Sequence, residues 1–204
     1  MMRFSVIMSL HNSAKFVKKA LNSVKSQTFG DYELICVCDS CTDDSAKIAR
    51  KYTDKVLEVN NQRMGPTLNA GLDIAQGEYI MFMDDDDWWL HEFVLEMIDN
   101  ALKINEIPVD VLFFSFLWKG IGYAHYRSNG GDNYYPAVWN KCWKRSFIGD
   151  HRFTDKQYGS DLVFHNEMMP LVKRFAEWDQ PFYYYNYLRK GSLTKQLQDG
   201  EIEE

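Results

Sequence analysis

The sequence has no long hydrophobic run, no excess of positive charge and few cysteines. None of its 204 residues lies in a stretch of the roughly 18 apolar residues that a membrane-spanning helix needs, so we expect no transmembrane segment. The formal net charge of -6 argues against nucleic acid as a partner, because cations on phosphates dominate such binding. Residues 1–8 resemble a signal peptide, but the apolar stretch is short and no small-residue cleavage site follows. We therefore expect a cytoplasmic protein, with peripheral attachment to a membrane left open.

The few cysteines do not form a recognisable metal site. Cys36, Cys38 and Cys41 form the pattern C-x-C-x-x-C, and Cys142 lies far away in the sequence. A thiolate site would need a further ligand pair at a typical spacing, which the sequence does not contain. Free cysteine is commonly buried as a small hydrophobe. We therefore favour structural burial of free thiols over metal binding, which fits a reducing compartment.

Strand and helix signals alternate through the first half of the chain. The strands predicted from short apolar runs are 4–8, 31–39, 55–59, 78–83 and 110–117, and the helices predicted from periodic apolar positions are 13–26, 43–52, 66–75 and 90–105. Near-continuous apolar strands that alternate with helices indicate an α/β fold, with a mostly parallel sheet flanked by helices.

The composition changes after Lys119. Glycines at 120, 122, 130 and 131 and a series of tyrosines suggest loops rather than another strand–helix unit. A chain of 204 residues predicts a single domain. Within it we expect a Rossmann-like nucleotide-binding half at about 1–118 and a smaller acceptor-side half at about 119–204, whose tail 199–204 should be frayed.

Four consecutive aspartates, Asp84 to Asp87, follow the predicted strand 78–83. Open α/β sheets bind their ligands at the carboxyl ends of strands. Carboxylates this close repel one another unless a cation lies among them, and their oxygens suit Mn²⁺ or Mg²⁺. The alternative is a solvated acidic turn before the helix predicted at 90–105, where negative charge is also favourable. The cluster alone does not decide between the two.

Short motifs follow one another in a characteristic order along residues 4–195. They are S-V-I-M-S-L-H-N at 5–12, V-C-D-S-C-T-D at 37–43, D-D-D at 84–86, W-N-K at 139–141 and G-S-D at 159–161. Their order and spacing resemble the family 2 glycosyltransferases, which have the GT-A fold. The family's second motif is V-D-D-G-S-T-D, so Cys38, Ser40 and Cys41 replace its first aspartate, its glycine and its serine. Ser160 replaces the glutamate of the family's G-E-D.

The resemblance implies a nucleotide-sugar donor and a bound Mn²⁺ or Mg²⁺. It assigns contacts with the nucleotide-sugar to Ser9, His11, Asp39, Arg63, Asp84 and Asp85. Asp39 would accept a hydrogen bond from the base, although an aspartate at this place could instead cap the helix near Asp43. Asp86 would be the direct metal ligand, and Asp87, outside the D-x-D triplet, should matter much less.

The expected reaction also needs a base. A hydroxyl is a poor nucleophile at neutral pH, so a carboxylate must take its proton. The resemblance places Asp161 in this role, with helix capping as the alternative. The sequence thus predicts an inverting, metal-dependent glycosyltransferase of polysaccharide biosynthesis, which moves a sugar from a UDP-sugar to a glycan, lipid-linked or other hydroxyl acceptor.

Three other functions compete with this one. A non-catalytic relative that binds a nucleotide or glycan is compatible with the substitutions at Cys38, Ser40 and Ser160. A nucleotidyltransferase would use the same metal and nucleotide. A dinucleotide-dependent oxidoreductase is disfavoured, because no G-x-G-x-x-G follows the first strand.

Overall fold

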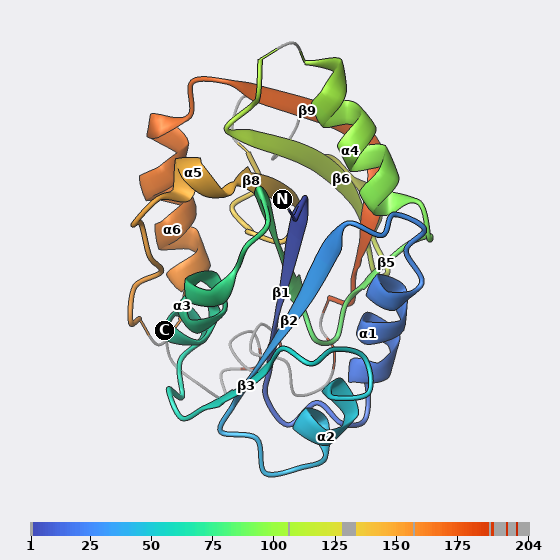
Figure 1. Ribbon diagram of the computed structural model, residues 1–204, viewed down its shortest axis with the longest axis vertical. Helices are drawn as coiled ribbons and strands as arrows, with labels where there is room; N and C mark the ends of the chain where they lie inside the picture. Colours follow the sequence, from blue (N-terminus) through green and yellow to red (C-terminus); the bar gives the residue numbers. More distant parts are fainter. Residues whose placement is uncertain are drawn as a thin grey trace.

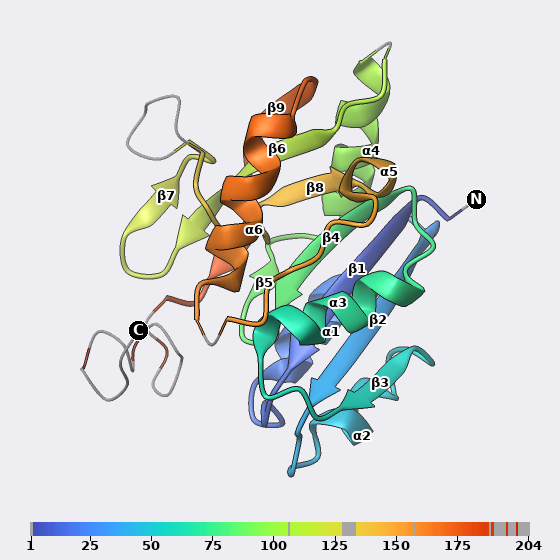
Figure 2. The same ribbon diagram turned by 90° about the vertical axis from the view of Figure 1, so that its left-hand side faces the viewer.

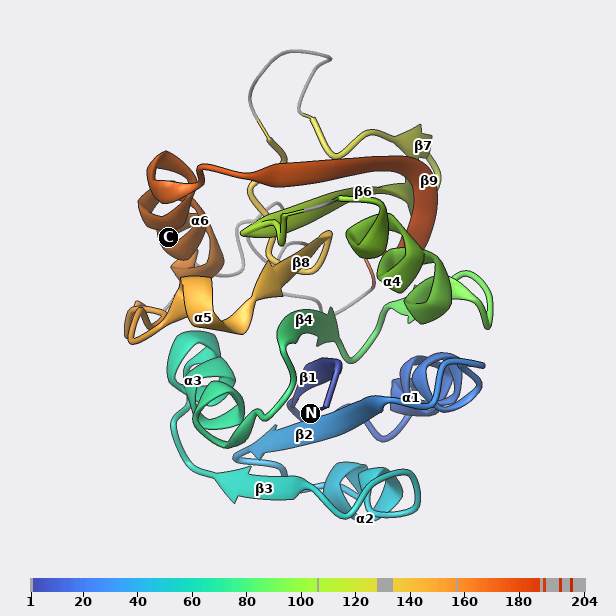
Figure 3. The ribbon, with the colours of Figure 1, turned by 45° about the horizontal axis from the view of Figure 1, so that its top comes forward.

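The computed structural model describes residues 2–105, 107–127, 134–156 and 158–187, together with residues 189, 195 and 199. In these residues nine strands form one mixed sheet, whose order is β3-β2-β1-β4-β8-β6-β9-β5, with β7 paired to β6 (Figure 1). Helices α1, α2 and α4 lie on one side of the sheet, and α3, α5 and α6 lie on the other (Figure 3). The sheet is therefore covered on both faces, as the sequence predicts.

The elements follow one another along the chain in this order: β1 (Phe4–Leu10), α1 (Val17–Lys25), β2 (Tyr32–Asp39), α2 (Ser45–Ala49), β3 (Val56–Val59), α3 (Met64–Ile74), β4 (Tyr79–Asp84), β5 (Trp88–Trp89), α4 (Val94–Ile104), β6 (Val111–Trp118), β7 (Gly122–Ala124), β8 (Lys141–Lys144), α5 (Arg145–Ile148), α6 (Ser160–Met168), a 3₁₀ turn (Met169–Leu171) and β9 (Phe175–Tyr185). The described helices include none long and apolar enough to cross a membrane.

The first half matches the predicted alternation of strands and helices. β1 lies between β2 and β4, and β2 pairs with β3, all in parallel. The side chains of β1 from Phe4 to Met8 are fully buried, because a central strand contacts helices on both of its faces. The predicted fifth strand is also present, as β6.

Two helices begin later than predicted. α1 begins at Val17 rather than at Asn12 or Ser13, and Asn12 has a left-handed φ of 48° that is incompatible with a helix. α4 begins at Val94 rather than at Leu90, because Trp88 and Trp89 form a short strand against Tyr184 and Tyr183 of β9. Local periodicity cannot reveal this distant pairing.

The second half contains more sheet than the sequence predicts. β8 lies antiparallel between β4 and β6, and β9 extends over 11 residues parallel to β6 (Figure 2). The sheet is therefore parallel through β3-β2-β1-β4 and mixed beyond β4. The predicted loop glycines at 130 and 131 and the predicted frayed tail after 199 lie outside the described residues.

The cysteine prediction is partly wrong. Cys36 and Cys142 are free and buried, and burial raises the pKa of Cys36 to about 12. Cys38 and Cys41 instead form a disulfide. The chain turns back after the end of β2, which brings the two Cα atoms to 5.8 Å, within the usual range for a disulfide.

Glu33 is a buried carboxylate that ties the amino ends of three strand regions together. It accepts hydrogen bonds from the Ser5 hydroxyl at 2.5 Å and from the backbone N–H of Gln76 at 2.6 Å and of Gly77 at 3.2 Å, and it pairs with Lys55. Burial raises the pKa of Glu33, but the hydrogen bonds from Lys55, Ser5 and Gln76 outweigh it and hold the pKa below its ordinary value.

We expect Glu33→Gln to lower the free energy of unfolding at pH 7 by about 1–3 kcal/mol, because buried hydrogen bonds to a charged group are lost. Since the folded-state pKa is lowered, this stabilisation is present above the ordinary pKa of 4.5 and disappears as the pH falls through the folded value. Urea titrations at neutral and acidic pH measure both effects. Glu58→Gln, at an exposed ion pair with Arg50, is the matched control and should change little. An equal loss in both variants would contradict the assignment.

Candidate functional site

The carboxyl ends of β1, β2 and β4 bring the predicted donor-side residues to one edge of the sheet. Ser9 pairs in register with Val37 of β2 and with Asp84 of β4. Because these strands are parallel, the residues that follow them, including His11 and Asp39, meet at the same edge. Figure 2 shows the start of α6 on the same side as the arrowheads of β1 and β4. The predicted site thus gathers in one region.

Asp39 is buried at the end of β2 and organises the loop before α3. Its Oδ1 accepts hydrogen bonds from the backbone N–H of Asn61 at 2.8 Å and of Gln62 at 3.0 Å. Its Oδ2 accepts from the backbone N–H of Arg63 at 3.1 Å and from the Thr67 hydroxyl at 2.9 Å. Burial raises the pKa of Asp39, but these bonds outweigh it and lower the pKa, so the group stays ionised. The carboxylate therefore holds α3's entrance, not the helix near Asp43.

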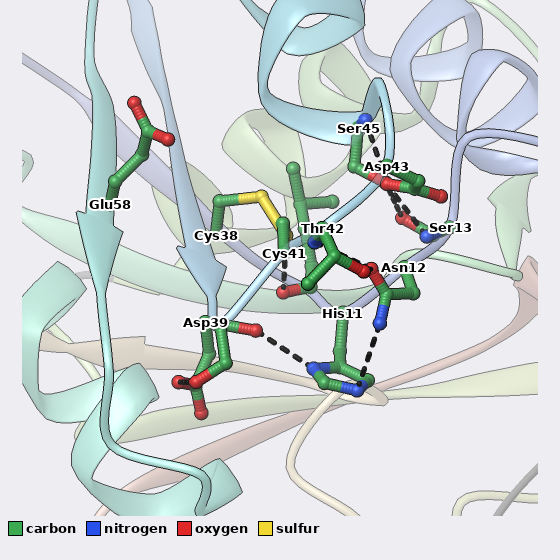
Figure 4. Close-up of a disulfide and its surroundings, with 12 residues drawn as sticks. His11, Asn12, Ser13, Cys38, Asp39, Cys41, Thr42, Asp43, Ser45 and Glu58 are labelled. Atoms are coloured by element: carbon green, nitrogen blue, oxygen red, sulfur yellow. Dashed lines mark hydrogen bonds between the residues drawn. A yellow bond between two sulfur atoms is a disulfide. The ribbon is translucent and has the colours of Figure 1, made fainter.

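His11 connects the β2 end to the acidic cluster. Its ring Nδ1 lies 2.8 Å from the backbone oxygen of Asp39 (Figure 4), and its backbone N–H donates to Asp85 Oδ2 at 3.2 Å. Arg63 lies at the opposite side of the Asp39 loop, with its Nε 3.5 Å from Asp155 Oδ1. Ser9, by contrast, is placed at this edge by the strand register described above.

The acidic cluster concentrates negative charge in a poorly hydrated place. Burial, together with the charges of Asp86, Asp85 and Asp161, raises the pKa of Asp84 well above its ordinary value. Burial and the charge of Asp86 raise the pKa of Asp85 to about 7. Asp86 forms an ion pair with Arg189, whose Nε lies 2.5 Å from Oδ2. A cation is thus already bound to the residue expected to ligate the metal.

The chemistry of these oxygens fits Mn²⁺ or Mg²⁺. Among the described residues no three His, Cys, Asp or Glu side chains converge into a complete metal cage. Mg²⁺ in nucleotide sites is commonly held by one or two carboxylates together with substrate phosphates. Asp86, with Asp84 or Asp85, could supply such a share of the ligands, since a divalent ion would also offset the repulsion that raises the pKa of Asp84.

β9 supports the acidic turn in a way that the sequence does not reveal. The Tyr183 hydroxyl accepts a hydrogen bond from the backbone N–H of Asp84 at 3.1 Å, and the backbone N–H of Asn186 donates to Asp87 Oδ1 at 2.8 Å. Asp87 is only 1% exposed. We expected this residue to matter little because it lies outside the triplet, but it anchors the cluster to the last strand. Its replacement should disturb the whole turn.

Asp161 lies in the first turn of α6 and close to the donor edge. The helix begins after Gly159, so Asp161 is not its N-cap. Burial raises the pKa of Asp161. The carboxylate of Asp161 is near enough to Asp84 to raise the pKa of Asp84. Gly65 allows α3 to pack closely against the segment before α6, because a Cβ atom at this position would lie 2.1 Å from the backbone oxygen of Thr154.

Lys141 is a functional candidate that sequence reasoning passed over, although it belongs to the W-N-K motif. It is fully buried in β8, and its ammonium donates to the backbone oxygens of Tyr135 at 2.6 Å and of Ala137, and to Asn140 Oδ1 at 2.8 Å. Burial lowers the pKa of Lys141 well below its ordinary value, although the charge of Asp161 opposes this change. In return Lys141 opposes the rise in the pKa of Asp161. In its protonated form Lys141 thus favours the ionised form of that carboxylate.

Comparisons with known proteins agree with this geometry. The model of the family described as glycosyl transferase family 2 matches residues 5–178. Glycosyltransferase GlyA from Streptococcus pneumoniae is 25% identical over 95% of this chain and 32% of its own length. The putative glycosyltransferase EpsH from Bacillus subtilis is 27% identical over 95% of this chain and 63% of its own. The chain thus spans less than two thirds of these relatives.

Solved structures show the same fold. The crystal structure of Staphylococcus aureus TarS in complex with UDP-GlcNAc has a TM-score of 0.83 and 24% identity, and covers 95% of this chain and 61% of that one. Glucosyl-3-phosphoglycerate synthase from Mycobacterium tuberculosis, in complex with Mn²⁺, UDP and phosphoglyceric acid, has a TM-score of 0.68 and 15% identity, and covers 100% of this chain and 80% of that one. The α/β sheet and its flanking helices are therefore of the GT-A type.

The crowding of carboxylates should cost stability at high pH. Because the folded-state pKa of Asp84 is raised above its ordinary 3.8, stability is lost as the pH rises through the folded value. We expect Asp84→Asn, measured in EDTA, to raise the melting temperature by at least about 2 °C at about pH 8 and by much less at about pH 5. Asp54→Asn, at an exposed position, is the matched control and should show no such trend. A variant less stable than the parent at both pH values would oppose this explanation.

Proposed function

Because this chain belongs to glycosyl transferase family 2, we propose that it is an inverting, metal-dependent glycosyltransferase that moves a sugar from a UDP-sugar to a hydroxyl of a glycan, lipid-linked or other acceptor. The relatives that suggest the donor include TarS, crystallised with UDP-GlcNAc. We further propose a role in polysaccharide biosynthesis in the cytoplasm, with a lipid-linked acceptor as the means of contact with a membrane.

One observation carries this proposal: the ends of β1 and β2, the acidic cluster and a separate, half-buried carboxylate, Asp161, lie together. His11 contacts both the Asp39 backbone and the Asp85 carboxylate, and the charge of Asp161 raises the pKa of Asp84. A simple acidic helix cap would not need the third group. A nucleotide-sugar has three parts that match this arrangement, namely a base, a diphosphate and a reacting sugar carbon.

We assign the donor contacts to Ser9, His11, Asp39, Arg63, Asp84 and Asp85, and the metal contact to Asp86. Ser9, His11 and the loop held by Asp39 would line the base and ribose. When bound, Mn²⁺ or Mg²⁺ would neutralise the diphosphate and ease its departure. Asp84 and Asp85 would orient ribose and metal-bound water. Arg189, which pairs with Asp86 in the free chain, would have to release that carboxylate.

We assign the proton transfer to Asp161. Its raised pKa makes it a stronger proton acceptor than an exposed aspartate, while its backbone hydrogen bonds and the charge of Lys141 oppose that rise. A base that activates the acceptor hydroxyl for direct displacement implies attack from the face opposite to the diphosphate. The anomeric configuration of the sugar is then inverted.

The metal role predicts a specific loss. UDP with Mn²⁺ should raise the melting temperature of the parent through mass action, and Asp86→Ala should abolish this increase because it removes a direct ligand from a site with few protein ligands. Thermal shift with UDP alone, Mn²⁺ alone and both together measures the effect.

Asp54→Ala, which removes an exposed carboxylate, is the control and should respond like the parent. If Asp86→Ala is still stabilised by UDP and Mn²⁺ as strongly as the parent, Asp86 is not the metal ligand.

The base role predicts a loss of rate without a loss of binding. Asp161→Asn should keep the parent's affinity for UDP and metal, because the donor contacts lie elsewhere, while transfer falls by at least about a hundredfold. Because the pKa of Asp161 is raised, the parent's rate should fall in acid at a pH above the ordinary aspartate value of 3.8. The released product should be a nucleoside diphosphate, and NMR of the glycoside should show inversion.

Asp150→Asn, at an exposed carboxylate, is the control for the base and should transfer sugar close to the parent rate. Pyrophosphate as the product would indicate a nucleotidyltransferase, and binding without any turnover of donor would indicate a non-catalytic relative. A retained anomeric configuration would also refute the mechanism.

A further inference from the structure

The Cys38–Cys41 disulfide closes the turn that carries Asp39. The bond joins the last part of β2 to the chain three residues later, and Asp39 and Ser40 lie between its two ends (Figure 4). Two of the positions at which this chain departs from the family motif are therefore the two ends of one covalent link. A chance exchange of buried residues would not place both sulfurs within bonding distance.

The turn closed by the disulfide is attached to both loops that border the donor edge. Its Thr42 backbone N–H donates to Asn12 Oδ1 at 2.8 Å, and Asp43 Oδ2 accepts from the backbone N–H of Ala14 at 3.0 Å. On its other side, the Ser40 hydroxyl lies 2.9 Å from Asp39 Oδ1 and 2.7 Å from Asn60 Oδ1. A movement of this turn would therefore reach the residues proposed to hold the base.

Backbone strain is concentrated around the same turn. Among the described residues, the non-glycine residues with positive φ are Asn12 at 48°, Ser40 at 51° and Gln62 at 56°. Asn12 bonds Thr42, and Gln62 donates to Asp39, so all three belong to the loops just described. Such conformations persist only where the surroundings enforce them. Ser40 stands where the family motif has glycine, and it is held on one side by the disulfide and on the other by the hydrogen bond from its N–H to the Val59 oxygen at 2.8 Å.

The two sulfur atoms differ in access. Cys38 is 1% exposed, whereas Cys41 is only partly buried. Cys41 Sγ also lies 3.5 Å from the backbone oxygen of Leu10, which could accept a hydrogen bond from a Cys41 thiol. Cys41 is therefore the more accessible of the two cysteines, and the Leu10 oxygen can accept a hydrogen bond from its reduced thiol. In a reducing compartment, disulfides are usually transient and redox-sensing.

We propose that Cys38–Cys41 is a reversible redox modification site that sets the affinity of the donor site for nucleotide. The disulfide holds Ser40 in its left-handed conformation and keeps Asp39 aligned with the loop 61–63. Reduction relaxes the turn, loosens that loop and weakens nucleotide binding, because preorganisation is lost. The direction of this effect rests on the nucleotide site proposed above.

The reaction is an exchange with a dithiol reductant. A reductant thiolate attacks Cys41 Sγ, the bond between the two protein sulfurs breaks, and Cys38 leaves as a thiolate that takes up a proton. The second thiol of the reductant then attacks the mixed disulfide and releases the Cys41 thiol. Two electrons pass to the protein, and the reductant becomes a disulfide.

The test compares the oxidised and dithiothreitol-reduced forms of the parent chain, with the thiols counted by alkylation and mass spectrometry. We expect reduction to weaken UDP binding with Mg²⁺ by at least about fivefold in calorimetry. We also expect faster amide hydrogen exchange at Asn61, Gln62 and Arg63, whose N–H groups donate to Asp39. The exchange measurement needs no ligand, so it tests the redox proposal independently of UDP binding. If the oxidised chain fails to bind UDP, that result contradicts the proposed function instead.

Two variants complete the test. A double variant with Cys38→Ala and Cys41→Ala should resemble the reduced parent and ignore dithiothreitol. Cys36→Ala, at a buried free cysteine in the same strand, should keep the parent's response. Should the double variant not fold, the reduced parent gives the same comparison. Equal exchange at 61–63 in both redox states, or four free thiols in the chain purified without reductant, would overturn the proposal.

Discussion

The mutual repulsion of carboxylates held together at one sheet edge is the constraint on which the site depends. Asp84 and Asp85 lie where burial disfavours charge, and their neighbours raise their pKa values further. Carboxylates that repel one another would ordinarily move apart or point into water. Here the acidic turn is hydrogen-bonded to Tyr183 of β9 and to Asn186 directly after it, in the second half of the chain. The fold thus maintains an unfavourable charge distribution that a cation and a diphosphate can relieve.

Contacts between the two halves of the chain hold this cluster in place. β9 pairs with β5 directly after the aspartates, and Gly65 allows the start of α3 to meet the segment before α6. The first contact fixes the acidic turn, and the second places Asp161 near it. A parallel sheet ending at β4 would supply the donor edge alone. The antiparallel β8 contributes the buried Lys141, whose protonated form opposes the rise in the pKa of Asp161.

That the predicted site residues meet at one sheet edge could be inferred from the sequence, because the signals are local. Apolar runs define β1, β2 and β4, and the predicted residues lie at or next to the carboxyl ends of these strands. What the sequence could not show depends on distant pairing: β5 looked like the start of a helix, and Asp87 looked dispensable until its bond with Asn186 was known. The disulfide was missed for a related reason. Cys38 continues an apolar strand, and only the three-dimensional turn brings Cys41 back to it.

The crowding of hydrogen bonds at Asp39 links the base site to the turn that follows it. A carboxylate has about four lone-pair sites. Asp39 accepts from three backbone amides, and the hydroxyls of Thr67 and Ser40 also lie within hydrogen-bond distance, although each has one hydrogen and a second acceptor. Under the proposed function, a nucleotide base that bonds the same carboxylate would compete with these donors. Ser40 is the donor that can leave most easily, because Asn60 Oδ1 lies 2.7 Å from its hydroxyl. Under the proposed function, base binding and the conformation of Ser40 would be coupled, and the disulfide that encloses Ser40 would act on the same equilibrium.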